Sequence, residues 1–495
     1  MGGVALSGLT SFNSFWLGWL AYGILLAISA FLLLWSWRKT GAGRALGWML
    51  ILAFCLRLAG GLALQLLLPV VGYDEDVQKA GYVFFDAYQR DNQAWDLASS
   101  GQPLSAAFRG EKFISDQYGG LLALSAGVYH LLSPDAHRPV LILILTALFG
   151  GLGAAFTYAA VRLRWGESTA RIAGWIMALY PEAVLLGASQ MREPFLIALF
   201  AIAFWGVLAW RDRRREAILA LALSLAGMLL ISWRVALVAG GMLAVWFGLD
   251  VLAESTRPAW RWLGRAGGVL GFLALAAVSW NWLREAAVWD AIVTVQGSGM
   301  MQWIFEHLGK DWRIPFMTVY GLAQPVLPAT IVDPAAWIWR ILNILRALGW
   351  YALAPFVIYG FFTTFKAPAG RERRVLLWLA GMSALWILLS AARAGGDQWD
   401  NPRYRTLFLP WLALLAAWAW QFARRRHDPW LGRWLAVEAA FLLLFTNWYA
   451  VRYTGFGLKL DLPLTALLVM LSAGVILGGG WLLGRRRNKK EIPHS

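Results

Sequence analysis

The sequence predicts an all-α fold, a polytopic bundle of transmembrane helices that forms one domain over residues 1–495, and three observations predict it. Only 15% of the residues are charged and 59% are hydrophobic, whereas soluble domains carry about 25% charged residues. Apolar runs long enough to cross a bilayer recur along the chain. Arginine and lysine gather in alternate short connections between these runs, as in multi-pass proteins of the plasma (inner) membrane.

Thirteen apolar runs approach the roughly 20 residues that a helix needs to cross a bilayer. They lie near residues 14–36, 46–70, 139–161, 172–190, 195–210, 216–232, 235–253, 267–285, 341–363, 375–391, 406–422, 434–450 and 463–484. The first run lacks a basic lead-in and a small-residue cleavage site, so we expect a retained span and not a signal peptide. The sequence therefore predicts about 13 spans.

The basic connections predict how the bundle is oriented. They lie near residues 38–44, 162–171, 211–215, 257–265, 366–374, 424–433 and 485–490. Under the positive-inside rule these connections are cytoplasmic, which puts the N-terminus outside and the C-terminus in the cytoplasm. The formal net charge of +16 is then mostly a consequence of topology, and we expect no nucleic-acid partner.

This orientation leaves two large extracytoplasmic loops, over residues 71–138 and 286–340. Residues 118–132 are apolar but too short to span comfortably, and a span there would put the arginines of 162–171 outside. We therefore expect an interfacial helix, a helix that lies in the membrane surface, within the first outer loop.

The first outer loop is rich in acids, and these suggest a site as well as a solvated acidic face. Polar groups held at membrane depth are often functional. Asp74 and Glu75 follow directly after a predicted span, Asp86 follows within the loop, and Asp91 begins the pattern Asp91-x-x-x-Trp95-x-x-Ala98.

These features resemble the GT-C superfamily of integral-membrane glycosyltransferases, and within it the phospholipid carrier-dependent branch of protein O-mannosyltransferases and aminoarabinose transferases. That branch has a catalytic acid in its first outer loop, often as Asp-x-x-x-Tyr-x-x-Ala, which Asp91, Trp95 and Ala98 match with Trp in place of Tyr. An Asp-Glu pair after a span is echoed by Asp74-Glu75. The resemblance favours Asp91 as the catalytic acid, with Asp74 and Asp86 as alternates.

Later segments extend the resemblance in the same order along the chain. Lys112 stands where the family has a basic residue before an interfacial helix, although the family's prolines are absent here. Glu193, in Met191-Arg192-Glu193-Pro194, matches an acid of the second outer loop. The segment Asn401-Pro402-Arg403-Tyr404-Arg405 is similar to an Arg-Tyr segment before a late span.

The resemblance implies an enzyme that transfers a sugar from a polyprenyl-phosphate carrier to a lipid, glycan or protein acceptor at the extracytoplasmic face. A carboxylate would act as general base in a single inverting displacement. Cations would hold the donor phosphate, since arginine donates paired charge-assisted hydrogen bonds, and the candidates are Arg192, Lys112, Arg403, Tyr404 and Arg405. Asp91 and Glu193 also offer oxygen ligands for a divalent cation, Mg or Mn.

Two other functions remain open. A glycan polymerase or ligase with a lipid-diphosphate donor would need similar basic outer loops. A lipid or solute transporter would show ionisable residues in mid-span and repeated halves, whereas the charges here lie mostly at span ends, with Arg57 and Glu438 as the main exceptions. The single cysteine, Cys55, rules out a disulfide framework and a cysteine-based zinc site.

Overall fold

A computed structural model of the protein describes residues 2–10, 14–109, 118–248 and 309–490, together with isolated positions between 257 and 306. Every regular element in these residues is a helix, so the predicted all-α class is confirmed. The predicted run at 267–285, the first part of the second outer loop and Lys112 lie outside the continuously described residues.

Seven described helices are long and apolar enough to cross a membrane. They are α2 (Phe15–Lys39), α3 (Arg44–Val71), α7 (Val140–Leu179), α16 (Trp337–Thr364), α17 (Arg371–Ala394), α20 (Trp430–Thr454) and α21 (Leu462–Lys490). An eighth results if α18 (Asp400–Thr406) and α19 (Leu409–Arg426), which meet at 73°, form one broken span. Candidate membrane spans are therefore present, and in the part of the chain that the structure describes these helices are fewer than the expected 13.

Three predicted runs form helices that are either too short to cross a bilayer or begin with charged residues. They are α9 (Glu193–Ala209), α10 (Arg214–Ile231) and α11 (Trp233–Phe247). The first and last have 17 and 15 residues, and at 1.5 Å per residue they fall short of the roughly 30 Å hydrocarbon layer. α10 has 18 residues and begins with Arg214-Arg215-Glu216.

α7 is two antiparallel helices and not one straight rod, because its backbone leaves the helical region at Gly166 (φ 81°). A Cβ atom on Gly153 would lie 3.5 Å from Met177 Cε, and one on Gly174 would lie 3.4 Å from the Tyr158 ring. In a straight helix residues 153 and 177 would be about 36 Å apart. The chain therefore turns back at Gly166, which agrees with the two separate runs and the basic connection that the sequence predicts here.

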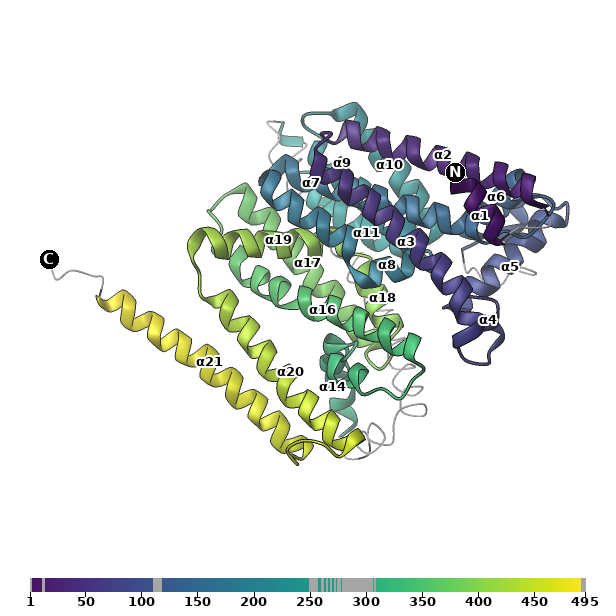
Figure 1. Cartoon of the computed structure of the whole chain (residues 1–495). Helices are drawn as coiled ribbons and strands as arrows, with labels where there is room; N and C mark the ends of the chain where they lie inside the picture. The colour runs from purple at the N-terminus through teal and green to yellow at the C-terminus, as the bar shows by residue number, and fades with distance from the viewer. Residues whose placement is uncertain are drawn as a thin grey trace.

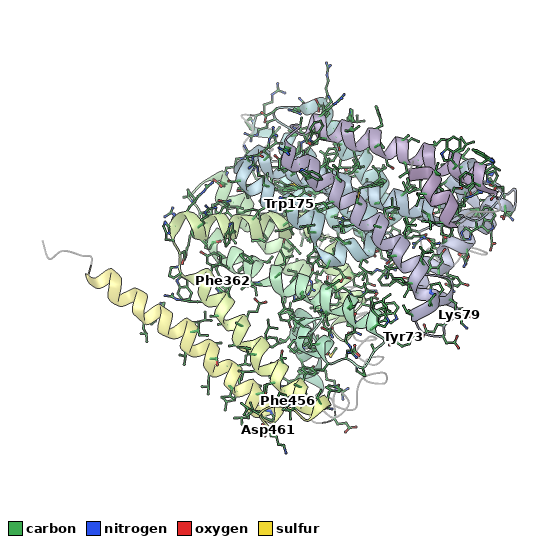
Figure 2. The ribbon with its side chains drawn as sticks, in the orientation of Figure 1. Tyr73, Lys79, Trp175, Phe362, Phe456 and Asp461 are labelled. Atoms are coloured by element: carbon green, nitrogen blue, oxygen red, sulfur yellow. The ribbon has the colours of Figure 1, made fainter. Side chains whose placement is uncertain are left out.

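Small elements gather at the end of the bundle where α3 stops. The first predicted outer loop holds α4 (Asp76–Lys79), α5 (Phe85–Ser99), the 3-10 helix η2 (Leu104–Phe108) and α6 (Gly120–Leu132). Figure 1 shows α4 and α5 beyond the end of α3, and Figure 2 marks this region by Tyr73 and Lys79. α6 covers the segment that the sequence assigns to an interfacial helix. The other short helices are α1 (Gly2–Thr10), α8 (Pro181–Ala188), α14 (Lys310–Ala323) and α15 (Leu327–Ile331).

The core lies among α3, α7, α9 and α19, where large aromatic side chains interlock. Trp411 is fully buried, and its ring lies 4.8 Å from that of Phe200 and 5.4 Å from that of Phe408. By contrast, only 6% of the apolar stretch of α20, and likewise of α21, is buried inside the protein. Figure 1 shows α21 beside α20 and pointing away from the remaining helices. Such exposed apolar faces are typical of helices that meet lipid.

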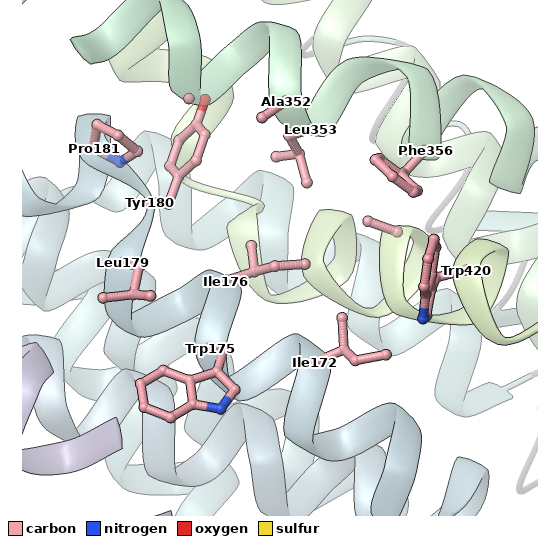
Figure 3. Close-up of a pocket in the computed structure, with 12 residues that line it drawn as sticks. Ile172, Trp175, Ile176, Leu179, Tyr180, Pro181, Ala352, Leu353, Phe356 and Trp420 are labelled. Atoms are coloured by element: carbon pink, nitrogen blue, oxygen red, sulfur yellow. The ribbon is translucent and has the colours of Figure 1, made fainter. Parts of the chain in front are cut away.

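An apolar pocket of about 390 Å³ lies between the second half of α7, α16 and α19. Figure 3 shows Trp175, Tyr180, Phe356 and Trp420 around it. No charged side chain lines this pocket. This pocket is therefore suited to apolar groups, whereas a second cavity has a charged lining.

Candidate active site

A polar cavity of about 280 Å³ lies where the ends of several helices meet. Four arginines and three carboxylates line it, together with hydroxyl groups and a few apolar side chains. The polar lining residues are Asp86, Tyr118, Arg192, Glu193, Ser232, Arg234, Arg393, Asp400, Arg403 and Tyr404. Charged residues at this density are expensive to bury unless they are paired, so the contacts among them define what the cavity can do.

Local sequence accounts for the place of each acid. Glu193 begins α9 and is followed by Pro194, which suits the first turn of a helix because it has no N–H to leave unpaired. Asp86 and Asp400 stand in the first turns of α5 and α18. Carboxylates are favoured at these positions by the positive end of the helix dipole. Three helix starts therefore bring three acids to one cavity.

Arg403 is the centre of the carboxylate cluster. Its Nε donates to Glu193 Oε1 at 2.6 Å, and its Nη1 lies 3.3 Å from Asp86 Oδ2 and 3.4 Å from Asp400 Oδ1. The Tyr404 hydroxyl donates to the other oxygen of Asp400 at 3.1 Å. The Arg403 side chain is 6% exposed, whereas that of Asp86 is 56% exposed. Arg403 is thus held within the protein while Asp86 stays accessible.

Glu193 is a buried carboxylate with one oxygen available. Burial raises the pKa of its carboxyl, but the charges of Arg403 and Arg192 outweigh burial and hold that pKa below its ordinary value. Glu193 Oε2 is buried and has no hydrogen-bond partner among the described residues. A buried acceptor without a partner is costly, so this oxygen is suited to accept a hydrogen bond from a ligand hydroxyl.

The other three arginines lie against aromatic rings. Arg192 lies over Tyr118 at 5.4 Å, Arg234 over Trp233 at 5.7 Å and Arg393 over Tyr404 at 5.9 Å. A guanidinium stacked on a ring still directs its N–H groups outward in its own plane. These arginines are half-buried, so oxygen atoms of an anionic ligand can reach them.

Asp91 belongs to a separate, closed cluster. It is 3% exposed, and it accepts hydrogen bonds from the hydroxyls of Tyr82 and Tyr129, each at 2.5 Å. His137 Nε2 lies 2.9 Å from Asp91 Oδ2 and stacks on Trp95, with ring centroids 5.5 Å apart. Burial, and then the charge of Asp91, raise the pKa of both tyrosines, so both remain hydroxyl donors. Asp91 does not line the polar cavity.

Asp74 and Glu75 also lie apart from the cavity. The Asp74 side chain is 91% exposed and pairs with Lys79 at 2.5 Å. Glu75 is exposed and accepts a hydrogen bond from Gln78 at 3.3 Å. Among the predicted acids, the structure therefore brings together Asp86 and Glu193, and it leaves Asp74, Glu75 and Asp91 elsewhere.

Arg405 points away from the cavity, to the end of α14. Its Nη2 donates to the carbonyl of Gln324 at 2.8 Å, and its guanidinium lies 3.4 Å from the Trp350 ring centroid. Asn401 donates to the carbonyl of Gly321 at 2.6 Å. A helix leaves its last carbonyls unpaired, and these side chains satisfy two of the carbonyls around the C-terminus of α14. α18 therefore presents Arg403 and Tyr404 to the cavity while its other face anchors it.

A buried ion pair fixes the turn that precedes α18. Arg346 binds Glu182 at 2.6 and 3.1 Å and donates to the Gln398 carbonyl at 3.0 Å. Its guanidinium also lies 4.0 Å from the Trp399 ring centroid. This pair joins α8 and α16 to the segment that carries Asp400 and Arg403.

The described residues do not form the cation site that the sequence suggests. No group of three or more His, Cys, Asp or Glu side chains in the described ranges has a geometry suited to a metal. Asp91 is bonded to two tyrosines and a histidine, and Glu193 is paired with Arg403. Both oxygens of Asp91 are therefore engaged, whereas Glu193 keeps Oε2 without a partner among the described residues and lines a cavity that Asp91 does not line.

Five polar lining residues were not among the sequence candidates: Tyr118, Ser232, Arg234, Arg393 and Asp400. Arg234 stands between two predicted spans, and Arg393 follows a third, on the side that the positive-inside rule leaves poor in basic residues. A basic residue on that side is the sequence feature that would have identified both arginines. Tyr118 has no comparable feature.

Comparison with known proteins gives little further information. No family model matches the chain, and no curated protein matches it. Among solved structures, it is similar to the archaeal oligosaccharyltransferase AglB from Archaeoglobus fulgidus, determined in complex with an inhibitory peptide and a dolichol-phosphate. The TM-score is 0.35 and the identity 13%, over 87% of this chain and 55% of that one, so the chain spans about half the length of that protein. At this level the likeness establishes neither a family nor an activity.

Proposed function

We propose that this protein is a membrane glycosyltransferase that transfers a sugar from a polyprenyl-phosphate carrier to an acceptor hydroxyl at the extracytoplasmic face. The observation that carries the proposal is the polar cavity, in which an accessible carboxylate, Asp86, shares the space with four arginines at the ends of apolar helices. A lipid-linked anionic sugar donor needs cations for its phosphate and a carboxylate for the acceptor, all near the membrane surface. The order of short motifs that resembles the GT-C superfamily supports the same reaction.

Asp86 is the proposed general base. The acceptor oxygen attacks the anomeric carbon, its proton passes to an Asp86 oxygen, and the bond from the anomeric carbon to the phosphate oxygen breaks. Polyprenyl phosphate leaves from the opposite face, so the anomeric configuration inverts. Glu193 Oε2, the buried oxygen without a partner, orients a hydroxyl of the acceptor or of the sugar.

Asp91 has a different proposed role. Its oxygens are engaged by Tyr82, Tyr129 and His137, so it anchors α5 and thereby supports the place of Asp86. This assigns the catalytic role to one of the alternates that the sequence leaves open, and a structural role to the acid that the family pattern favours.

A donor assay tests the reaction. Purified protein in lipid nanodiscs is given radiolabelled polyprenyl-monophosphate sugar or the corresponding diphosphate sugar, with a membrane extract as acceptor source, and label transfer is measured. We expect transfer from the monophosphate, abolished in Asp86→Asn. Transfer from the diphosphate alone would support a glycan polymerase or ligase, a function that the four cavity arginines also favour. No transfer from either donor, with intact Asp86 and native folding, would contradict the proposal.

The proposed orientation is testable by cysteine labelling in intact cells. In a Cys55→Ser background, Phe456→Cys lies in the exposed turn between α20 and α21, and Ala369→Cys lies in the exposed connection between α16 and α17. We expect a membrane-impermeant thiol reagent to label residue 456 and to reach residue 369 only after permeabilisation. The opposite pattern would put the cavity on the cytoplasmic side.

A further inference from the structure

An apolar groove of about 580 Å³ lies between α2 and α3, away from the candidate active site. Its lining runs from Leu26 to Trp37 on α2 and from Gly47 to Cys55 on α3. Both helices pack closely against α7 but only loosely against each other, and Figure 1 shows them spreading apart from the turn that joins them. Two helices that are neighbours in the chain therefore leave an apolar space between them.

The groove has the length of one membrane leaflet. From Leu26 to Trp37 an α-helix rises about 16 Å, and one leaflet contributes about half of the roughly 30 Å hydrocarbon layer. Both helices are long and apolar enough to cross a membrane, which puts the groove at the depth of lipid tails. One acyl chain therefore fits along the groove, with its headgroup at the end formed by Trp37 and Gly47.

Basic side chains stand at that end of the groove. Arg38 and Lys39 lie in the last turn of α2 and Arg44 begins α3, and all three are exposed. Arg162 of α7 donates to a carbonyl of the connecting turn at 3.0 Å, which adds a fourth cation and fixes the turn on α7. Residues 1–73 contain no aspartate or glutamate, so neither α2 nor α3 supplies an acid that would neutralise these charges.

Hydrogen bonds order the entrance to the groove. The Trp37 indole donates to the carbonyl of Gly43 at 3.0 Å, which keeps its ring between the apolar lining and the basic turn. Tryptophan is enriched at this depth of a membrane. Glu167 of α7 is engaged by the Tyr158 hydroxyl at 2.6 Å and by Arg171 at 2.9 Å. The entrance therefore combines an ordered turn with an excess of positive charge.

We infer that the groove binds an anionic glycerophospholipid, with one acyl chain between α2 and α3 and its phosphate at the basic turn. A neutral apolar ligand would use the groove and not the cations, and a soluble anion would use the cations and not the groove. Clusters of lysine and arginine beside membrane-spanning helices attract anionic headgroups, and the apolar groove holds the chain of the same molecule. This site lies apart from the polar cavity and does not depend on the transfer reaction.

The hairpin of α9 and α10 supplies a matched control within the chain. Its turn is also basic, with Arg213, Arg214 and Arg215 exposed. Its two helices, however, pack closely, because a Cβ atom on Gly206 would lie 2.9 Å from Leu221 Cγ. The α9–α10 turn therefore has positive charge like that of the α2–α3 turn, but its helices leave little space between them.

Native mass spectrometry of the protein in detergent tests the choice of lipid. Dioleoylphosphatidylglycerol, which is anionic, and dioleoylphosphatidylcholine, which is zwitterionic, carry the same chains, and the Kd of the first bound lipid is measured for each. We expect the wild type to bind the anionic lipid about tenfold more tightly or better, because each basic residue near the headgroup contributes. The triple variant Arg38→Gln, Lys39→Gln and Arg44→Gln should lose this preference, and the corresponding triple glutamine variant of the α9–α10 turn should keep it.

Cys55 tests the place of the acyl chain. It is the single cysteine of the sequence, it is exposed, and it lines the groove, so benzyl methanethiosulfonate attaches an apolar ring there and nowhere else in the chain. We expect the attached ring to occupy the groove and to weaken binding of the anionic lipid by about tenfold, as overfilling a packed apolar space does. A reductant removes the ring and should restore the original Kd, which shows that the protein stayed folded.

Three results would each overturn the inference. Equal Kd values of the wild type for the two lipids would show that the basic turn selects no headgroup. An equal loss of preference in the α9–α10 variant would assign the preference to positive surface charge in general. An unchanged Kd after the benzyl modification of Cys55 would put the lipid outside the groove.

Discussion

Asp86 and Asp91 stand five residues apart on the same helix and have opposite surroundings. Five residues turn an α-helix by about 140° beyond a full circle, so the two carboxylates face different parts of the molecule. Asp86, with a 56% exposed side chain, faces the arginines of the polar cavity. Asp91, 3% exposed, is enclosed by two tyrosines and a histidine. One short segment thus supplies an accessible acid and a buried anchor.

The difference shows why a motif alone does not decide between two neighbouring acids. Asp91 matches the spacing of a family pattern, but its side chain is 3% exposed and its oxygens are already bonded by Tyr82, Tyr129 and His137. Asp86 contacts Arg403 at 3.3 Å, and its side chain is 56% exposed. The predictions below test this division of roles between Asp86 and Asp91.

The largest effect is expected for Asp86→Asn. The amide keeps the size of the side chain but does not accept the acceptor's proton, and general-base assistance is typically worth about 10²–10⁴-fold. We expect turnover in the donor assay to fall by that order, with an unchanged Tm, because the side chain is exposed. Asp96→Asn is the control, since Asp96 is also exposed on α5 and does not line the cavity.

Full activity of Asp86→Asn would end the proposed role of this acid. The same assay on Asp74→Asn would then be the next step, because Asp74 is the other exposed alternate in the loop. An inactive Asp74→Asn beside an active Asp86→Asn would move the catalytic role to the Asp74-Glu75 pair.

The next effect is expected for Asp91→Ala, and it concerns stability. The substitution leaves two buried tyrosine hydroxyls and a histidine without their acceptor, and each such group costs about 1–3 kcal/mol. We expect Tm to fall by roughly 5 °C or more, while the folded fraction keeps most of its turnover. A variant with native Tm and no turnover would instead make Asp91 the base.

The sequence was sufficient for the parts of the fold that depend on apolar length and charge. The apolar runs became helices wherever the structure describes them, and the basic segment 162–171 became the turn at Gly166. The number of spans could not be predicted from apolar length and charge alone. α9 and α11 are too short to cross a bilayer, and α10 starts with three charged residues. Helix length within a packed bundle depends on neighbours that a hydropathy pattern does not contain.

Part of the lining of the candidate site could also be expected from the sequence, and the rest depends on packing. Glu193, Arg192 and Arg403 stand beside apolar runs that end at one face, so sequence could bring them together. Whether an acid on α5 faces the cavity or the core depends on the rotation of that helix. This rotation is set by long-range contacts such as those of Tyr129 and His137 with Asp91. Tyr129 and His137 stand 38 and 46 residues from Asp91 along the chain, so no local sequence pattern predicts these contacts.

A smaller effect is expected for Tyr129→Phe, which removes one donor of the Asp91 cluster and keeps the ring. A net hydrogen bond to a charged group is worth about 1.5–3 kcal/mol, so Tm should fall by a few degrees with little change in turnover. Tyr88→Phe is the control, because Tyr88 packs on Tyr82 with ring centroids 5.4 Å apart. Equal Tm values for the two variants would show that the Tyr129 bond does not hold α5.

The smallest effect is expected for Asp135→Asn, and it should depend on pH. Asp135 lies two residues before His137 and binds Arg138 at 2.6 and 2.7 Å, and Arg138 also donates to the Ser14 side chain at 2.7 Å. The hydrogen bonds from Arg138 lower the pKa of the Asp135 carboxyl below its ordinary value. A depressed carboxyl pKa means that the stabilisation is complete above the unfolded-state pKa, about 3.9, and is lost as pH falls through the folded-state value. Asp135→Asn should therefore have a Tm slightly below that of the wild type at pH 6, and the difference should shrink as the pH is lowered from about 5 to 3.

A Tm difference that stays constant over this pH range would show that the Asp135 charge does not stabilise the segment in which His137 contacts Asp91.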